Sequence, residues 1–393
     1  MNCPAIHVGD SKETNIILPL YEVITMNFGV PKEVRPYEFR VGLTPAAVDA
    51  LVRADHEVFV ERSAGRDAGF HDNDYEKVGG KIVYSAAEAY GRADIVVKVT
   101  RPAEKEYMHF RPGQSIFCFI HLAVSSPDLM ESFKENEITA IAYETIQKED
   151  GILPVLMPTS ELAGGLAPII AGQLMQSING GKGILLNGIP GTPPAAVVII
   201  GAGILGTFAA RSFSRLGAQV TVLDKELKAL QRIDNMFGGR ISTMISNPFN
   251  LTKAVSFADV LVCCAAVPGQ RAPILITRSM VQMMSSRSVL IDLSIDNGGC
   301  AETSHPTNLV HPTFVKEGII HYCVPNVPTL VARTASYALS NAHLPYLLEI
   351  GKDGIGEAIK NISALRAGVN VYQGKLAHPG VAEELSRKVE VEL

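Results

Sequence analysis

Short apolar runs alternate with amphipathic stretches along most of this chain. From residue 27 the runs FGVP, EVFVE, IVVKV, IFCFI and ITAIAYE have the lengths and residue types of β-strands, and helical patterns such as residues 45–54 lie between them. Apolar strands that alternate with amphipathic helices are typical of parallel α/β sheets. The first part of the chain is therefore predicted to form an α/β domain.

A second series of the same kind begins near residue 196, with the runs AVVII, VTVLD, DVLVCCAA, SVLIDLS and HYCVP. Between the two series, residues 158–178 predict one long helix that opens with the start signal Pro-Thr-Ser. Residues 336–369 have a helical pattern and no strand partner in the second series, so we expect them to fold back on the first domain. The expected fold is α/β, with two Rossmann-like domains on doubly wound parallel sheets and a cleft between them.

The overall composition limits the classes of function. The chain has 393 residues, of which 47% are hydrophobic and 19% charged, as in a folded protein with two domains. A formal net charge of −5 and the lack of a long Lys/Arg run argue against nucleic-acid binding. No apolar stretch approaches the roughly 20 residues of a membrane span. Residues 1–25 lack the pattern of a signal peptide and are treated as an extension of unknown role.

The cysteines indicate the redox setting. There are six of them, at positions 3, 118, 263, 264, 300 and 323, and they form no CxxC pair. Cys263 and Cys264 are adjacent within an apolar run, which favours buried thiols over a disulfide framework. We therefore expect a reducing, cytoplasmic setting.

A glycine-rich turn follows the first run of the second series. Gly201, Gly203 and Gly206 come directly after AVVII and open a helical stretch. The first glycine permits a tight turn, the second lets the backbone approach a pyrophosphate, and the third lets helix and strand pack closely. The start of the helix, with Ile204 and Leu205, then offers N–H groups to the phosphates. This pattern predicts a dinucleotide-binding turn.

The next run ends in Asp224, at the spacing that the dinucleotide fingerprint requires. Its carboxylate is expected to accept hydrogen bonds from ribose hydroxyls and to repel a 2′-phosphate, which favours NAD over NADP. Lys225 is a cation that would tolerate a phosphate. The alternative is that the glycines only shape a turn and that Asp224 caps the following helix. On the first interpretation, residues 155–327 are the NAD-binding domain, and residues 1–154 with 328–393 are the substrate domain.

Four polar residues lie at strand ends or at a loop next to a strand, where ligands of such sheets bind. Arg40 is suited to a bidentate grip on a carboxylate, His121 to proton exchange near neutral pH, and Asp296 precedes a sharp turn. Lys98 lies within a strand, with Thr100 on the same face. Each also has a structural interpretation: a surface ion pair, a core histidine, the start of a turn, or a solvated charge.

At this point the chain resembles the alanine dehydrogenases, which share their fold with the NAD-binding domain of proton-translocating transhydrogenase. The resemblance covers about residues 26–363 and is carried by segments such as PYEFRVGLTP, FIHLA, IAYET, LPVLMPTSELAGGLA, VLIDLSIDNGG and YCVPNVP. It implies that Arg40 holds a substrate carboxylate, that His121 is the acid/base and that Asp296 assists it. It further implies that Ser160 and Asn326 contact the cofactor and that the assembly is a homohexamer.

One position departs from the family. Where the family has a second lysine, in a pattern like LKVKEP, this chain reads Lys98-Val-Thr100-Arg101-Pro. That lysine helps to bind the substrate, and a lost cation that pairs with a carboxylate costs several kcal/mol unless it is replaced. Both Lys98 and Arg101 are open as the replacement. Thr159 and Val327 also stand where the family often has methionine, which would change the pocket.

The sequence thus predicts an NAD-dependent amino-acid dehydrogenase that carries out reversible oxidative deamination of a small L-amino acid. Two alternatives stay open, a nucleotide-binding protein with lost or changed catalysis and a reductase of imines formed from an amino acid and a keto acid. We expect no metal in the chemistry, because no metal-ligand spacing is present. The expected partners are the small substrate and further copies of the chain, not nucleic acid or a membrane.

Overall fold

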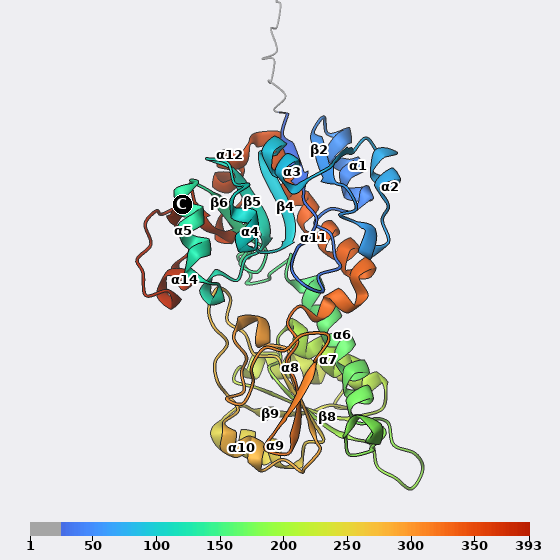
Figure 1. Ribbon diagram of the computed structural model, residues 1–393. Coiled ribbons are helices and arrows are strands. Elements are labelled where there is room, and N and C mark those ends of the chain that lie inside the picture. Colours follow the sequence, from blue (N-terminus) through green and yellow to red (C-terminus); the bar gives the residue numbers. More distant parts are fainter. Residues whose placement is uncertain (1–24) are drawn as a thin grey trace, which may run out of the picture.

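The computed structural model describes residues 25–393, and these form two β-sheets with helices packed against them (Figure 1). One sheet has eight strands in the order β15-β14-β6-β5-β4-β1-β2-β3, and the other has seven in the order β12-β13-β11-β10-β7-β8-β9. In Figure 1 the first sheet and its helices lie above the second. The predicted α/β fold with two Rossmann-like sheets is confirmed. Residues 1–24, with Cys3 and most of the N-terminal extension, lie outside the described residues.

The first sheet holds the early part of the chain. Its first six strands are β1 (Asn27–Val30), β2 (Glu57–Glu61), β3 (Lys81–Val83), β4 (Ile95–Thr100), β5 (Ser115–Phe119) and β6 (Thr139–Ala142). These six strands run parallel, and β4, β5 and β6 are buried along their whole length. Burial on both faces of a parallel sheet explains why their sequences are nearly continuous apolar runs.

Short helices connect these strands. They are α1 (Pro45–Arg53), α2 (Asp72–Glu76), α3 (Ala86–Arg92), α4 (Glu104–Tyr107) and α5 (Pro127–Glu135), with 3₁₀ turns η1 (Arg66–Ala68) and η2 (Leu122–Val124). Both α1 and α5 begin with proline, which fits the first helical position because its missing N–H would have no partner there.

The second sheet repeats the arrangement. Its strands are β7 (Ala196–Ile200), β8 (Gln219–Asp224), β9 (Ser242–Ile245), β10 (Val260–Cys263), β11 (Val289–Asp292), β12 (Thr313–Lys316) and β13 (Ile319–Tyr322). All are parallel except β12, which pairs antiparallel with β13 at the edge. The apolar run of β7 serves two cores, since Val197 and Ile199 face one and Val198 and Ile200 face the other.

Helices cover both faces of this sheet. They are α7 (Ile204–Arg215), α8 (Leu227–Phe237), α9 (Pro248–Phe257) and α10 (Arg278–Gln282), with 3₁₀ turns η4 (Ile295–Asn297) and η5 (Val327–Val331). The long helix α6 (Met157–Leu174) packs along α7 so closely that a Cβ at Gly164 would lie 2.7 Å from the backbone nitrogen of Ala209. The predicted helix 158–178 is confirmed but ends earlier, with the 3₁₀ turn η3 (Ser177–Asn179) after it.

The C-terminal region returns to the first sheet, as predicted. It contains α11 (Ala332–Asp353), α12 (Ile355–Asn361), α13 (Ser363–Gly368), β14 (Val369–Tyr372), β15 (Lys375–Leu376) and α14 (Pro379–Glu384). Residues of α11 and β14 join the same core as the first six strands. The helical pattern predicted over 336–369 is confirmed as three helices, since Gly354 at φ +77° ends α11, and the region is followed by the antiparallel strand β14 beside β6, which was not predicted.

Two further expectations concern single features. The five cysteines within residues 25–393 are all buried free thiols, as predicted. Within the same range, no helix combines the length and the apolar character that a membrane span needs.

Candidate active site

The glycine turn between β7 and α7 has the geometry that its sequence predicts. Gly201 has φ +107°, a region that side chains rarely adopt, and a Cβ there would lie 2.9 Å from the carbonyl oxygen of Cys264. A Cβ at Gly206 would fall directly onto the carbonyl oxygen of Gly201. Around Gly203, by contrast, a Cβ would meet nothing within 4 Å. The turn is tight at two glycines and open at the third, beside the free N–H groups of the first turn of α7.

Asp224 ends β8 next to this turn. Its Oδ2 accepts a hydrogen bond from the backbone N–H of Ala202 at 2.6 Å, and its Oδ1 accepts one from Glu226 at 2.8 Å. The carboxylate is therefore fixed against the glycine turn. Lys225 follows as an exposed residue.

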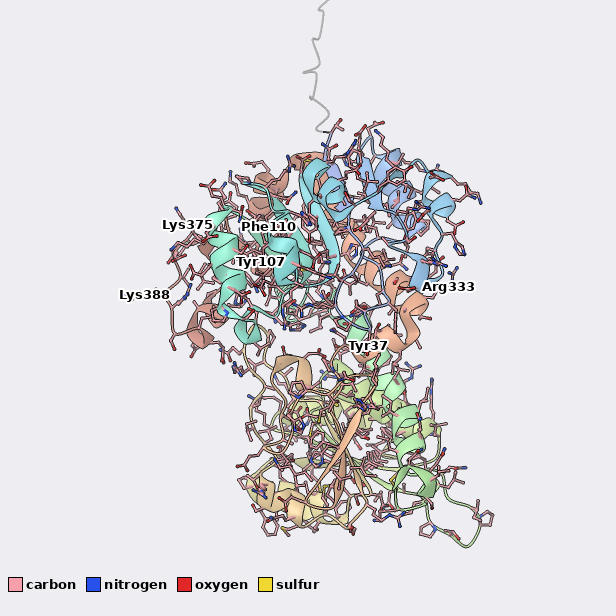
Figure 2. All side chains as sticks on the ribbon, viewed as in Figure 1. Tyr37, Tyr107, Phe110, Arg333, Lys375 and Lys388 are labelled. Carbon is pink, nitrogen blue, oxygen red and sulfur yellow. The ribbon has the colours of Figure 1, made fainter. Side chains whose placement is uncertain are left out.

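Arg40 lies in the loop between β1 and α1 and is 2% exposed. Its guanidinium makes a bidentate ion pair with Glu38, at 2.7 Å from Nε and 2.6 Å from the second terminal nitrogen. That same nitrogen donates to Oδ1 of Asn326 at 3.3 Å. Figure 2 labels Tyr37, in the same loop, at the junction between the two halves of the molecule. The surface ion pair considered from sequence is excluded, because both partners are buried.

Asn326 links Arg40 to Asp296. It follows β13 in a left-handed conformation, with φ +55°, and its backbone N–H donates to both carboxylate oxygens of Asp296 at 3.0 and 3.3 Å. Burial raises the pKa of the Asp296 carboxyl above its ordinary value, while His121, the Asn326 amide and nearby arginines oppose the rise. Asn326, which follows β13, and His121, which follows β5, thus both lie near the carboxylate of Asp296.

His121 follows β5 by two residues, and its ring contacts the second half of the chain. Its Nδ1 lies 3.1 Å from Oδ1 of Asn297, the residue after Asp296. Its backbone has φ +46° and is fixed by Glu144, whose carboxylate accepts the N–H of His121 at 2.6 Å and that of Ile120 at 3.2 Å. The ring is partly buried and held by the other half of the molecule, unlike that of a core histidine.

Lys98 and Thr100 contact a different carboxylate. Lys98 is fully buried, with Nζ 3.2 Å from Glu33 and 2.9 Å from Glu106. Burial lowers the pKa of this ammonium, but the two carboxylates outweigh that effect and leave the pKa raised. Thr100 donates its hydroxyl to Glu33 at 2.7 Å. The solvated charge considered for Lys98 is therefore excluded.

In the described part of the chain, Arg101 lacks the carboxylate contacts that Lys98 and Thr100 make. It is partly buried, and its guanidinium makes no ion pair or hydrogen bond with residues 25–393. Since Thr100 pairs with Phe119 across β4 and β5, Arg101 lies beside the end of β5, where His121 follows two residues on. Burial and the nearby Arg35 lower the pKa of Arg101, while Glu144 and Asp296 act in the opposite direction.

The remaining predicted cofactor residues lie around the glycine turn and at the start of α6. Ile204 and Leu205 form the first turn of α7, and Ser160 lies in the first turn of α6, with its N–H bonded to the carbonyl of Leu156. Ser160, Ile204 and Leu205 are each partly buried. The sequence predicts no metal in the chemistry; among the described residues, Cys263, Asp292 and Cys300 place possible ligand atoms within 4.8 Å of one another. The oxygens of Asp292 already accept backbone N–H groups from Ser294 and Cys300.

Sequence reasoning missed the partners of the predicted residues. Glu33 and Glu38 neutralise Lys98 and Arg40, Asn297 contacts the His121 ring, and Glu144 fixes its backbone. Glu33 and Glu38 both precede Arg40 within seven residues, and this nearness in sequence was the available signal. The bonds of Asn297 and Glu144 are made over 176 and 23 residues, with no local pattern to reveal them.

Known proteins match nearly the whole described chain. The family model for the alanine dehydrogenase/PNT N-terminal domain matches residues 29–163, and that for the C-terminal domain matches residues 167–379. The chain is 43% identical over 359 residues to the alanine dehydrogenase of Methanococcus maripaludis. The matched region covers 91% of the present chain and 96% of the Methanococcus protein. The chain is equally similar, at 43% identity and the same coverage, to alanine dehydrogenase 2 of Staphylococcus aureus.

Solved structures agree with these matches. The structure of an L-alanine dehydrogenase matches this one with a TM-score of 0.85 and 42% sequence identity. The match covers 92% of the present chain and 99% of the L-alanine dehydrogenase chain. The transhydrogenase from Sinorhizobium meliloti has a TM-score of 0.73 at 23% identity, which shows the shared fold alone. Fold and strand-end residues together define an α/β protein built on two Rossmann-like sheets. The chain belongs to the alanine dehydrogenase/PNT family, and the resemblance seen in the sequence is confirmed.

Proposed function

We propose that this protein is an NAD-dependent oxidoreductase that converts a small L-amino acid into its 2-oxo acid and ammonia, and carries out the reverse reaction. The observation that carries the proposal is that Asn326 joins Arg40 and Asp296 beside the strand end where His121 lies. A carboxylate-binding cation, an acid/base and a partly buried carboxylate then surround one centre. The reaction class comes from the relatives, which are named alanine dehydrogenases.

The glycine turn fits a dinucleotide. The open space around Gly203 lets a pyrophosphate approach the backbone, and Asp224 is fixed where a ribose would lie. We assign cofactor binding to Ser160, Gly201, Gly203, Ile204, Leu205, Gly206, Asp224 and Asn326. These residues would hold NAD, which would supply a hydride acceptor for the substrate Cα.

His121 is the acid/base of the proposal. The oxygen of an amide only accepts hydrogen bonds, so the contact with Asn297 Oδ1 places the proton of neutral His121 on Nδ1. Nε2 is then free to take a proton from the water that adds to the iminium, and to return it to the leaving ammonia. Asp296 stabilises the positive charge that His121 gains, because the carboxylate acts at close range in a partly buried setting.

Arg101 and not Lys98 replaces the missing family lysine in this proposal. Lys98 is fully buried and paired with two carboxylates, so it has no free approach to a substrate. Arg40 already has Glu38 as counter-ion, whereas the partly buried guanidinium of Arg101 has no partner among the described residues. An unpaired, partly desolvated cation binds an anion strongly. The substrate carboxylate is therefore assigned to Arg40 and Arg101 together.

Variants at this position test the assignment. Arg101→Ala is expected to lower kcat/KM for the amino acid roughly 10- to 100-fold, mainly through KM, because a charge-assisted hydrogen bond contributes about 1.5–3 kcal/mol. Its affinity for NADH should not change. Arg92→Ala, at an exposed arginine that contacts Glu88 at 3.8 Å and the ring of Phe59, is the matched control. An Arg101→Ala variant with the wild-type KM would exclude this role. The double variant Thr100→Lys with Arg101→Glu has the charge pattern of the family at these positions, and it should recover the activity that Arg101→Ala loses.

The activity itself is tested with a panel of L-amino acids and NAD. We expect a rise in NADH absorbance with at least one small amino acid, and NADH consumption with its 2-oxo acid and ammonia. NADH binding without turnover in either direction would contradict the proposal and favour a nucleotide-binding protein. NADH consumption that requires an amino acid and an oxo acid together would favour an imine reductase, whose wider pocket Thr159 and Val327 would help to form.

We also propose the division of labour between the halves. Residues 1–154 and 328–393 act on the substrate, and residues 155–327 bind NAD. One continuous core that joins the first six strands to α11 and β14 supports this division. A homohexamer is proposed from family resemblance, and sedimentation of the purified protein tests it.

A further inference from the structure

A small recess lies beside His121. Its lining includes the polar residues His121, Glu144, Gln270, Asn297 and Asn370. It leaves about 10 Å³ in which the centre of a water molecule can lie, and this is roughly the space that one buried water needs. The recess thus has the size and the polarity of a site for a single small polar molecule.

Asn370 gives this recess a free donor. The residue lies in β14 and is 1% exposed. Its Oδ1 accepts a hydrogen bond from the hydroxyl of Thr145 at 2.8 Å, which fixes the orientation of the amide. Its Nδ2 has no hydrogen-bond partner among the described residues. A buried amide donor without a partner is destabilising, so its retention here points to a ligand.

Glu144 gives the recess an acceptor. Its two oxygens accept the backbone N–H groups of Ile120 and His121, and these bonds hold the carboxylate in place. A carboxylate has about four lone-pair sites, so it can accept further hydrogen bonds. The recess therefore combines a group that only donates with a group that only accepts.

This combination selects the ligand. A molecule that bridges Asn370 Nδ2 and Glu144 must accept one hydrogen bond and donate another. Water does both, whereas ammonium, the main form of ammonia at neutral pH, has no lone pair and cannot accept from the amide. We infer that the recess binds the water consumed in the deamination, with Asn370 as its positioning residue and His121 as the base beside it. The inference rests on the proposed function.

The step balances as follows. The oxygen of the water forms a bond to the Cα of the iminium, and the iminium π electrons move onto nitrogen. The proton lost by the water goes to Nε2 of His121, and a carbinolamine results. The same proton then returns to the nitrogen, and as the C–N bond breaks the carbinolamine hydroxyl forms the carbonyl and gives its own proton to Nε2 of His121. The products are the 2-oxo acid and ammonia, and His121 passes the remaining proton to solvent. Asn370 and Glu144 orient the water throughout and exchange no proton.

Transient kinetics of the full-length enzyme separate hydride transfer from the addition of water. In Asn370→Asp the side chain still accepts from Thr145 but loses its donor, and in Asn370→Ser the donor is moved away from the recess. With NAD and the amino acid, both variants should form the first NADH per active site at the wild-type rate. Their steady-state turnover should fall roughly 10- to 100-fold, since misplacing a reacting molecule by about 1 Å can cost up to about 100-fold. The solvent deuterium isotope effect on turnover should rise.

The possible outcomes test the water site separately from the proposed function. Asn361→Asp, at an exposed position of α12, is the matched control and should behave as wild type. NADH binding by each variant, followed by fluorescence, shows that the fold is kept. Unchanged turnover in both Asn370 variants would overturn the water site and leave the proposed function intact. A raised KM for ammonia with unchanged deamination would also overturn it, by assigning the recess to ammonia. A wild-type enzyme that forms no NADH would contradict the proposed function itself.

Discussion

The backbone N–H of Asn326 donates to the carboxylate of Asp296 at 3.0 and 3.3 Å, while the side chain of the same residue contacts Arg40. Asn326 adopts φ +55°, a conformation that asparagine tolerates better than most residues. One residue thus fixes a carboxylate through its main chain and a guanidinium through its side chain. Substitution can separate the two contributions.

Asn326→Gly keeps the left-handed backbone and the N–H on Asp296 but removes the amide that contacts Arg40. We expect kcat/KM for the amino acid to fall roughly 10-fold, or about 1.4 kcal/mol, because one hydrogen bond to a charged group is lost. The melting temperature should hardly change. Asn326→Ala is the comparison variant, since it loses the same amide and adds strain of about 1–2 kcal/mol at positive φ. Equal kcat/KM in Asn326→Gly and wild type would show that the side chain is dispensable.

The three glycines of the turn should respond differently to alanine. Gly203→Ala meets no atom within 4 Å, so its melting temperature should stay near wild type. Its added methyl group occupies the space proposed for the pyrophosphate, and we expect the Kd for NADH to rise at least roughly 10-fold. Gly206→Ala should instead lower the melting temperature, because its Cβ falls on the carbonyl of Gly201. Gly165→Ala, also free of neighbours, is the control, and unchanged NADH affinity in Gly203→Ala would place the cofactor elsewhere.

Asp224 should decide between NAD and NADP. Asp224→Asn keeps an oxygen that can accept from Ala202 or Glu226 but removes the negative charge that repels a 2′-phosphate. We expect the ratio of NADPH to NADH affinity to rise roughly 10-fold, which corresponds to about 1.4 kcal/mol, with Lys225 as a nearby cation. Fluorescence titration with both nucleotides measures it. The exposed Asp234→Asn is the control, and an unchanged ratio in Asp224→Asn would refute the proposed ribose contact.

The sequence predicted the central strands and missed the edges. Strands β4, β5, β10 and β11 are buried along their whole length and read as apolar runs. The missed strands β3, β9, β12 and β15 lie at the four edges of the sheets and are short or largely exposed. An edge strand is stabilised by pairing on one side only, and its solvent-facing residues lack an apolar pattern. The missed β14 is buried but follows a helical stretch directly, so its start had no turn signal.

The candidate site was predictable for residues that carry a recognisable motif and not for their partners. Arg40, His121 and Asp296 stood at loops or strand ends, where the sheet rule directs attention. The burial of Lys98 between Glu33 and Glu106 depends on contacts among the loop after β1, strand β4 and helix α4. The single sequence carried no sign of these contacts, and so it left Lys98 and Arg101 as equal candidates.

A buried histidine of α11 gives the fold a predictable response to acid. His343 is fully buried, its Nε2 lies 2.9 Å from the carbonyl oxygen of Gly42, and its ring stacks on Tyr143. Burial lowers the pKa of His343 to about 4. The unfolded chain, whose histidines titrate near pH 6.5, therefore binds this proton before the folded protein does. Stability from neutral His343 is complete above about pH 6.5 and is lost as the pH falls toward about 4.

His343→Gln removes this titration and keeps a donor for the carbonyl of Gly42. At pH 7 the variant should be less stable than wild type, because the stacked ring is lost from the core. At about pH 5 the difference in free energy of unfolding should shrink by about 2 kcal/mol. The reason is that His343 of the unfolded wild type takes up a proton, which destabilises the folded wild type but has no counterpart in the variant. Urea unfolding at the two pH values measures the change, with the exposed His71→Gln as the control. A gap between wild type and His343→Gln that stays constant with pH would show that His343 does not carry this acid sensitivity.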